Sequence, residues 1–298
     1  MAGGGGAAPP APGAGLQPAR HRVLAAVMEN VPLPGDHRRL VLRAPEIVAS
    51  ASPGQFLSVW CHPPGEIETP PSAAVLRRPF SISRLRQPDR LELLLRVRGT
   101  GGRILAGKRA DDVLDIIGPL GHGFEIADDL RLAVIIAGGI GLAPVPFLAE
   151  TLAAKGVRTI ILAGATEDER LPFAVARPAG GPVTVPELSV LGAEVEYVSE
   201  AVEGAVVGWL LERRLDEFVA QRACFYAIGP RSMLRALAAV VGDRTAMQVS
   251  LEERMACGVG ACRSCVIPAI GESGPVFRTT CREGPVFRAT EVDWGRLE

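Results

Sequence analysis

The segment S-L-E-E-R-M-A-C-G-V-G-A-C-R-S-C, residues 250–265, holds three of the six cysteines of the chain. With one later cysteine they give the spacing C-x4-C-x2-C followed by a distant C. This is the ligand order of a plant-type [2Fe–2S] cluster, in which a tight loop supplies three thiolates and a later segment supplies the fourth. The two glycines between the first two cysteines favour such a loop, because glycine lets the backbone wrap closely. We therefore predict that the metal ligands are Cys257, Cys262, Cys265 and Cys281.

Zinc and disulfide bonds are the two other interpretations of these cysteines. A structural zinc site usually pairs two short knuckles, whereas Cys281 stands alone. Disulfides require an oxidising compartment, and residues 1–20 are almost wholly Gly, Ala and Pro, without the pattern of a secretory signal. We expect this segment to be a disordered tail and the protein to be cytoplasmic, with Cys61 and Cys224 as buried apolar side chains.

The length and composition indicate a multidomain protein of ordinary globular type. A chain of 298 residues accommodates two domains and a small third one. It is 48% hydrophobic and 22% charged, with a formal net charge of −1 and no run of lysine or arginine. This balance argues against nucleic acid or an anionic membrane as a partner. No apolar stretch is long enough to predict a membrane-spanning helix.

The first predicted domain, residues 21–125, has short alternating apolar runs that are separated by turn residues. One helix-like piece lies near residues 102–108. Short strands with few helices predict a small antiparallel β-barrel. The expected strands are residues 21–31, 39–43, 55–61, 80–84, 91–98 and 113–117.

Two segments of this barrel could bind a phosphorylated cofactor. In residues 77–83 an arginine precedes an extended Pro-Phe-Ser strand, and its guanidinium can pair bidentately with a phosphate. In residues 95–102 a strand runs into glycines at the start of a helix, where free N–H groups attract anions. An edge strand ending in solvated arginines and a plain strand-to-helix turn are the structural alternatives. The candidate cofactor-binding residues are Arg78, Pro79, Phe80, Ser81, Leu95, Arg96, Val97, Gly101 and Gly102.

The second predicted domain, residues 130–242, has the alternating pattern of a parallel α/β sheet. It opens with a continuous apolar run at residues 132–137, then the turn G-G-I-G-L-A-P and a helix at about 143–155. A strand, a glycine turn and a helix predict dinucleotide binding. Further strands are expected at 159–163, 193–198 and 223–228, and helices at 208–221 and 231–240. The candidate nucleotide-binding residues are Gly138, Gly139, Gly141, Gly229 and Pro230.

The choice between NAD and NADP depends on the residues after the second strand of this domain. Glu167 and Asp168 lie there, and an acidic side chain can bind the ribose hydroxyls. Arg170 could instead suit a 2′-phosphate. We expect NAD.

The barrel and nucleotide motifs together resemble the ferredoxin–NADP reductase superfamily. Residues 78–81 match its R-x-[YF]-S hallmark, whose arginine binds the FAD phosphate and whose serine lies beside the flavin ring. Residues 138–144 match its G-G-x-G-x-x-P turn, and residues 228–234 resemble its C-G-P-x-x-M-L segment. Two positions depart from the pattern, because Gly102 replaces a threonine and Ile228 replaces the cysteine.

The whole chain, from about residue 23 to 294, resembles the electron-transfer subunit of class 1B dihydroorotate dehydrogenase. Residues 251–262, 118–124 and 281–287 carry this resemblance. It implies a C-terminal [2Fe–2S] domain at 248–298, an FAD barrel, an NAD-binding domain and a role in pyrimidine biosynthesis. The implied partner is an FMN-containing catalytic subunit that oxidises dihydroorotate, in a hetero-oligomer that is a heterotetramer. Electrons would pass through the cluster and FAD to NAD+, and we expect no catalytic acid or base in this chain.

Two other functions fit the same motifs. The same module serves as an NAD(P)H-linked reductase subunit of hydrogenases or ferredoxin-dependent transhydrogenases, which differ in partner. A zinc-stabilised binding module without flavin is the non-enzymatic alternative.

Overall fold

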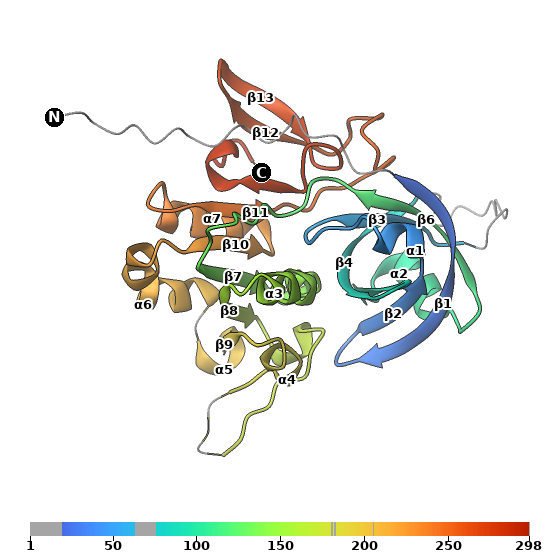
Figure 1. The fold of residues 1–298 in the computed structure, drawn as a ribbon, viewed down its shortest axis with the longest axis horizontal. Helices are drawn as coiled ribbons and strands as arrows, with labels where there is room; N and C mark the ends of the chain where they lie inside the picture. The colour runs from blue at the N-terminus through green and yellow to red at the C-terminus, as the bar shows by residue number, and fades with distance from the viewer. Residues whose placement is uncertain (1–19, 63–75, 180, 182, 205, 298) are drawn as a thin grey trace.

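The computed structural model describes residues 20–62, 76–179, 181, 183–204 and 206–297. The predicted disordered tail, apart from Arg20, lies outside the described residues. Figure 1 shows a barrel beside a layered α/β unit, with a two-stranded hairpin projecting above them. Within the described ranges, no helix combines the length and the apolar character needed to cross a membrane.

The N-terminal part is a closed antiparallel barrel with the strand order β1-β2-β5-β4-β3-β6. Alternating apolar side chains, including Leu40, Leu57 and Leu93, point inward and are fully buried. The barrel and its strands agree with the sequence prediction. Its elements are β1 (His21–Leu33), β2 (His37–Arg43), α1 (Pro45–Val48), β3 (Phe56–Trp60), β4 (Arg78–Arg86), β5 (Arg90–Arg96), α2 (Gly99–Ala106) and β6 (Val113–Leu120).

The second part is a six-stranded sheet with the order β14-β11-β10-β7-β8-β9. The five strands β7 to β11 run parallel to one another, and β14 pairs antiparallel with β11. The sequence predicted β7 to β10, whereas β11 and β14 were not predicted. The strands are β7 (Leu132–Gly138), β8 (Arg158–Ala165), β9 (Glu194–Ser199), β10 (Cys224–Ile228), β11 (Met247–Ser250) and β14 (Val286–Arg288).

Helices cover both faces of this sheet, which explains why every residue of β7 is buried. Val134 and Ile136 pack with α6 and α7, and Ala133 and Ile135 pack on the opposite face with α3. The predicted helix at 143–155 begins at Val145, because the preceding glycine turn forms a 3₁₀ helix. The helical elements are η1 (Gly139–Leu142), α3 (Val145–Ala154), η2 (Asp168–Arg170), α4 (Pro186–Ser189), α5 (Glu200–Glu203), α6 (Val207–Ala220) and α7 (Arg231–Val241).

The C-terminal part contains the hairpin of β12 (Val266–Gly271) and β13 (Gly274–Thr279), and η3 (Ala289–Glu291). The segment that follows Cys281 joins it to both other parts. The backbone N–H of His122, just after the barrel, donates to the carbonyl of Gly284 at 2.6 Å. Two residues after Gly284, β14 enters the second sheet, so the predicted range 248–298 contains β14 and most of β11.

Candidate functional site

The two predicted phosphate-binding segments of the barrel lie side by side. A Cβ added to Gly101, in the first turn of α2, would lie 3.3 Å from Cγ of Arg78 and 3.2 Å from Sγ of Cys61. The Arg78 guanidinium donates to the carbonyl of Leu76 at 3.3 Å, and among the described residues no carboxylate pairs with it. A cation beside the N-terminus of a helix fits a phosphate group.

Arg96 connects the barrel to the nucleotide-binding part. It ends β5, its Nε atom is buried without a hydrogen-bond partner, and it lines a cavity together with the glycine turns of the second part. Burial lowers the pKa of Arg96, and the neighbouring Arg98 and Arg170 lower it further. An electropositive group in this position favours an anionic ligand.

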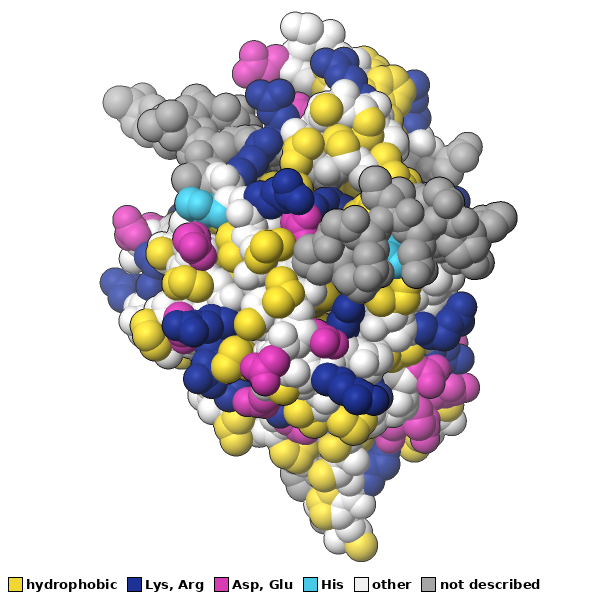
Figure 2. Space-filling view, turned by 90° about the vertical axis from the view of Figure 1, so that its right-hand side faces the viewer, with side chains coloured by type: hydrophobic (Ala, Val, Ile, Leu, Met, Phe, Trp, Pro, Cys, Tyr) yellow, Lys and Arg dark blue, Asp and Glu magenta, His cyan; other side chains and the backbone are white. Residues whose placement is uncertain are grey.

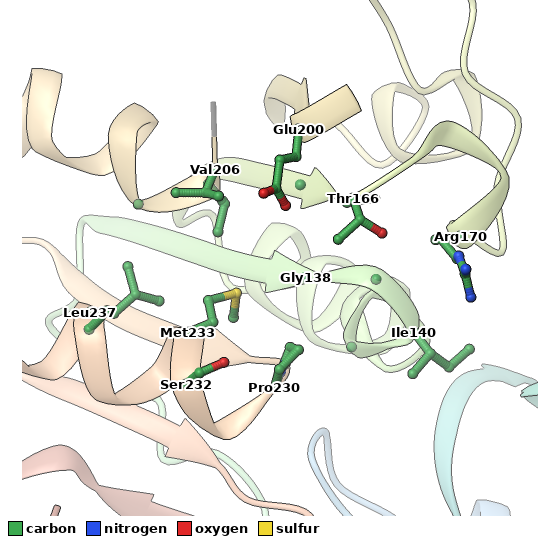
Figure 3. A pocket seen from close by; sticks show the side chains of 18 of the residues that line it. Gly138, Ile140, Thr166, Arg170, Glu200, Val206, Pro230, Ser232, Met233 and Leu237 are labelled. Carbon is green, nitrogen blue, oxygen red and sulfur yellow. The ribbon is translucent and has the colours of Figure 1, made fainter. Parts of the chain in front are cut away.

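A cavity of about 790 Å³ opens at the carboxyl edge of the parallel sheet. This edge is where parallel α/β sheets bind nucleotides. The η1 turn and the turn before α7 meet here, because Gly141 packs against the Ile228 carbonyl. Figure 3 shows both turns around the opening. The structure therefore brings together all the predicted nucleotide-binding residues, Gly138, Gly139, Gly141, Gly229 and Pro230, in one lining.

The lining also contains acidic residues that the sequence analysis did not select. Among the described residues that line the cavity, the acids are Glu200, Glu212 and Glu252, and the cations are Arg96 and Arg170, which the sequence analysis had named. Burial raises the pKa of Glu252. Glu200 is the first residue after β9. The sequence analysis could not identify it, because a single acid at the end of a strand belongs to no sequence motif.

Asp168, one of the two acids expected to read the ribose, has other partners. Its carboxylate accepts hydrogen bonds from Arg177 at 2.8 and 3.0 Å and from the Tyr197 hydroxyl at 2.7 Å. Arg177 also pairs with Glu203, and its guanidinium lowers the pKa of Asp168. Glu167 pairs with Arg170 at 3.3 Å. Neither expected acid is among the described residues that line the cavity.

The four predicted ligand cysteines lie in two pairs. The Cys257 sulfur accepts from the backbone N–H groups of Val259 and Cys262, each at 3.4 Å. Burial and a hydrogen bond with Cys265 raise the pKa of Cys281 to about 12. In the described parts of the chain, no three His, Cys, Asp or Glu side chains converge on a single metal position. Two thiolates for each of two irons fit a [2Fe–2S] cluster, whereas zinc requires four ligands around one ion.

The cysteine loop packs directly on the barrel. A Cβ added to Gly258, where φ is +70°, would lie 3.2 Å from Oγ of Ser58 in β3. Phe56 at the start of β3 packs in one apolar cluster with Cys265 and Cys281. β3 also pairs with β4, where Phe56 lies opposite Ser81. A single strand therefore separates the cysteines from the predicted flavin-binding strand, and neighbouring strands are about 4.8 Å apart.

The barrel, the nucleotide cavity and the cysteine loop define the class of nicotinamide-linked flavoprotein reductases with an iron–sulfur domain. The model of the iron–sulfur cluster binding domain of dihydroorotate dehydrogenase B matches residues 252–293. The electron transfer subunit of dihydroorotate dehydrogenase B (NAD(+)) from Caldanaerobacter subterraneus subsp. tengcongensis is 33% identical over 80% of this chain and 86% of its own length. That from Desulforamulus reducens is 34% identical over 84% and 90%. The chain belongs to the family of dihydroorotate dehydrogenase B electron-transfer subunits.

Solved structures support the same fold. A chain of the NADH-dependent reduced ferredoxin–NADP oxidoreductase has a TM-score of 0.73 and 23% identity, covering 92% of this chain and 91% of its own. A ferredoxin–NADP+ reductase mutant from Plasmodium falciparum, with 2′P-AMP, has a TM-score of 0.57 and 14% identity, covering 78% and 96%. The predicted multidomain fold is confirmed. The predicted cofactors, a [2Fe–2S] cluster, FAD and NAD, are the set that this family and fold support, while their assignment to individual residues stays a prediction.

Proposed function

We propose that the chain carries electrons from an FMN-containing, dihydroorotate-oxidising partner through a [2Fe–2S] cluster and FAD to NAD+, in pyrimidine biosynthesis. Family membership favours this partner over a hydrogenase or a transhydrogenase. We also propose a heterotetramer with two copies of each subunit. We place this complex in the reducing cytoplasm, where the six cysteines of the chain remain free thiols or cluster ligands.

The position of β3 carries this proposal. One edge of β3 pairs with β4, which carries the predicted flavin-binding residues, and side chains of β3 contact the cysteine loop. Electrons therefore cross a single strand between the cluster site and the flavin site. On the other side of β4, Arg96 at the end of β5 reaches the nucleotide cavity. The proposed cluster site, flavin site and nucleotide site thus lie in series within one chain. A relay from a one-electron carrier, the cluster, to a two-electron carrier, NAD+, requires this order. A bound flavin accepts electrons singly and delivers them as a hydride.

The residues of the chain bind and orient the cofactors. Arg78 and the first turn of α2 hold the flavin phosphates, and Ser81 lies on the strand beside the ring. The N–H groups of the η1 turn hold the dinucleotide pyrophosphate. The backbone N–H groups around Cys257 donate to its sulfur, which stabilises the thiolate that binds iron.

The hairpin supports docking of the partner beside the cluster. Four large apolar side chains are exposed there, and Figure 2 shows apolar groups gathered with arginines at the upper end of the molecule, where β12 and β13 project. Cys262, in the neighbouring loop, is also exposed. Apolar patches of this kind mark protein interfaces. The exposed residues are Val266, Ile270, Val276 and Phe277.

An absorption spectrum with iron, zinc and flavin analysis of the anaerobically purified chain tests the cofactors. We expect flavin and iron at about two irons per chain. Co-expression with an FMN-containing dihydroorotate-oxidising subunit then tests the relay, and we expect a complex that reduces NAD+ with dihydroorotate. A colourless zinc protein, or a loaded complex without this turnover, would refute the proposal.

A further inference from the structure

We propose that Glu200 selects NAD over NADP, by accepting hydrogen bonds from the adenosine ribose hydroxyls and by repelling a 2′-phosphate. This inference rests on the proposed function, because it concerns the nucleotide that the same cavity binds. Glu200 takes the role that the sequence analysis gave to Glu167 or Asp168. The Asp168 carboxylate is held by Arg177 and Tyr197, and Glu167 pairs with Arg170.

The orientation of the dinucleotide follows from the position of the barrel. Hydride transfer requires the nicotinamide to face the flavin, and the barrel lies at the end of the cavity marked by Arg96 and Arg170. The η1 turn in the middle holds the pyrophosphate. The adenosine therefore extends to the opposite end, where the first turns of α5 and α6 supply Glu200 and Trp209.

This end of the cavity is acidic. Figure 3 shows the Glu200 carboxylate turned toward the opening next to Thr166. Glu212 lines the same end, and within the described residues no hydrogen bond or ion pair engages the carboxylate of Glu200. Two of the nearby cations have carboxylate partners: Arg170 pairs with Glu167, and Arg177 pairs with Asp168 and Glu203. Arg213 stacks on the ring of Trp209. A 2′-phosphate with about two negative charges would face the carboxylates of Glu200 and Glu212.

A rigid network fixes the position of Glu200. Ser199, at the end of β9, donates its backbone N–H to Oε2 of Glu203 at 2.5 Å, which closes the single turn of α5. Arg177 ties Glu203 to Asp168, so η2 and α5 are bound to each other. Glu200, the first residue of that turn, is therefore held at the mouth of the cavity without using its own carboxylate.

Trp209 supplies the neighbouring surface for the adenine. It is 45% exposed and lines the cavity, while Arg213 stacks on its ring at 4.6 Å and is not part of the lining. An exposed indole face with an adjacent cation suits a flat purine. A ribose between Trp209 and the η1 turn lies within reach of Glu200.

The test compares nucleotide preference in Glu200→Gln and Glu200→Arg with a matched control, Glu187→Gln. Glu187 is exposed on α4, outside the cavity, and its substitution removes the same charge. The holo-chain is assayed for NADH and NADPH oxidation with ferricyanide. Titration calorimetry with 5′-AMP and with 2′,5′-ADP gives a readout that does not depend on turnover.

Glu200→Gln should weaken NADH and 5′-AMP binding by roughly 10-fold or more, the value of a hydrogen bond to a charged group. Glu200→Arg should reverse the preference, with 2′,5′-ADP binding more tightly than 5′-AMP. Glu187→Gln should resemble the wild type. If both glutamine variants keep the wild-type preference, the role of Glu200 is refuted. If the wild-type chain binds neither nucleotide fragment and oxidises neither NADH nor NADPH, the proposed function itself fails.

Discussion

Gly141→Ala should weaken NADH binding by moving the turn that holds the pyrophosphate. The new methyl group would lie 2.5 Å from the carbonyl oxygen of Ile228 and 2.9 Å from Cα of Gly229. It must retreat by about 1 Å to reach ordinary van der Waals contact. Both neighbours are backbone atoms of the turn after β10, so no side-chain rotation can relieve the clash.

Overpacking of this kind costs about 1–3 kcal/mol. If this strain appears when the nucleotide binds, the KM for NADH rises by about five- to 150-fold. NADH–ferricyanide turnover measures the change, while flavin content and a thermal melt show whether the fold is intact.

Gly208→Ala is the matched control. Gly208 lines the same cavity from α6, but no atom lies within 4 Å of an added Cβ. Its KM should equal that of the wild type. If the two variants have the same KM, the steric argument for the turn is wrong.

Three further substitutions test the cluster, the flavin site and the barrel. Cys262→Ser should abolish the [2Fe–2S] absorption and partner-linked turnover while FAD and NADH–dye activity remain, so retained partner-linked turnover would contradict the relay. Arg78→Ala should lower the FAD content severalfold, and full occupancy would exclude its role in phosphate binding. Asp115 accepts from Arg22 and Arg77, which outweigh burial and lower its pKa. Asp115→Asn should therefore lose about 2 kcal/mol of unfolding free energy at pH 7. The lowered folded pKa predicts that this difference fades as pH falls below about 4, and urea titrations at several pH values measure it.

Local pattern explains why most of the fold could be predicted. The barrel strands are short apolar runs between turn residues, with alternating burial in the first half of β1, and β7 is a continuous apolar run before a glycine turn. β11 and β14 could not be predicted in the same way, because they are four and three residues long. Their strand character depends on pairing with segments far away in the sequence, which no local period encodes.

The candidate site shows the same limit. The glycine turns and the cysteine spacing are contiguous signatures, so the sequence alone located them. Glu200 and Trp209 each contribute one side chain from the start of a helix, with no neighbouring motif. Asp168 had the position expected of a ribose-binding acid, but its use depends on Arg177, nine residues away, which the fold brings to it.

The pairing of β14 with β11 has a consequence for how the protein is made. During synthesis the ribosome releases β11 well before β14, and until then β11 is an uncovered edge whose free N–H and C=O groups can recruit other chains. A nonsense mutation or proteolytic cut just after Cys281 would leave all four predicted iron ligands present and yet yield insoluble material. Loss of solubility of the truncated protein, before any loss of iron, would then be the first sign of damage at this end of the polypeptide.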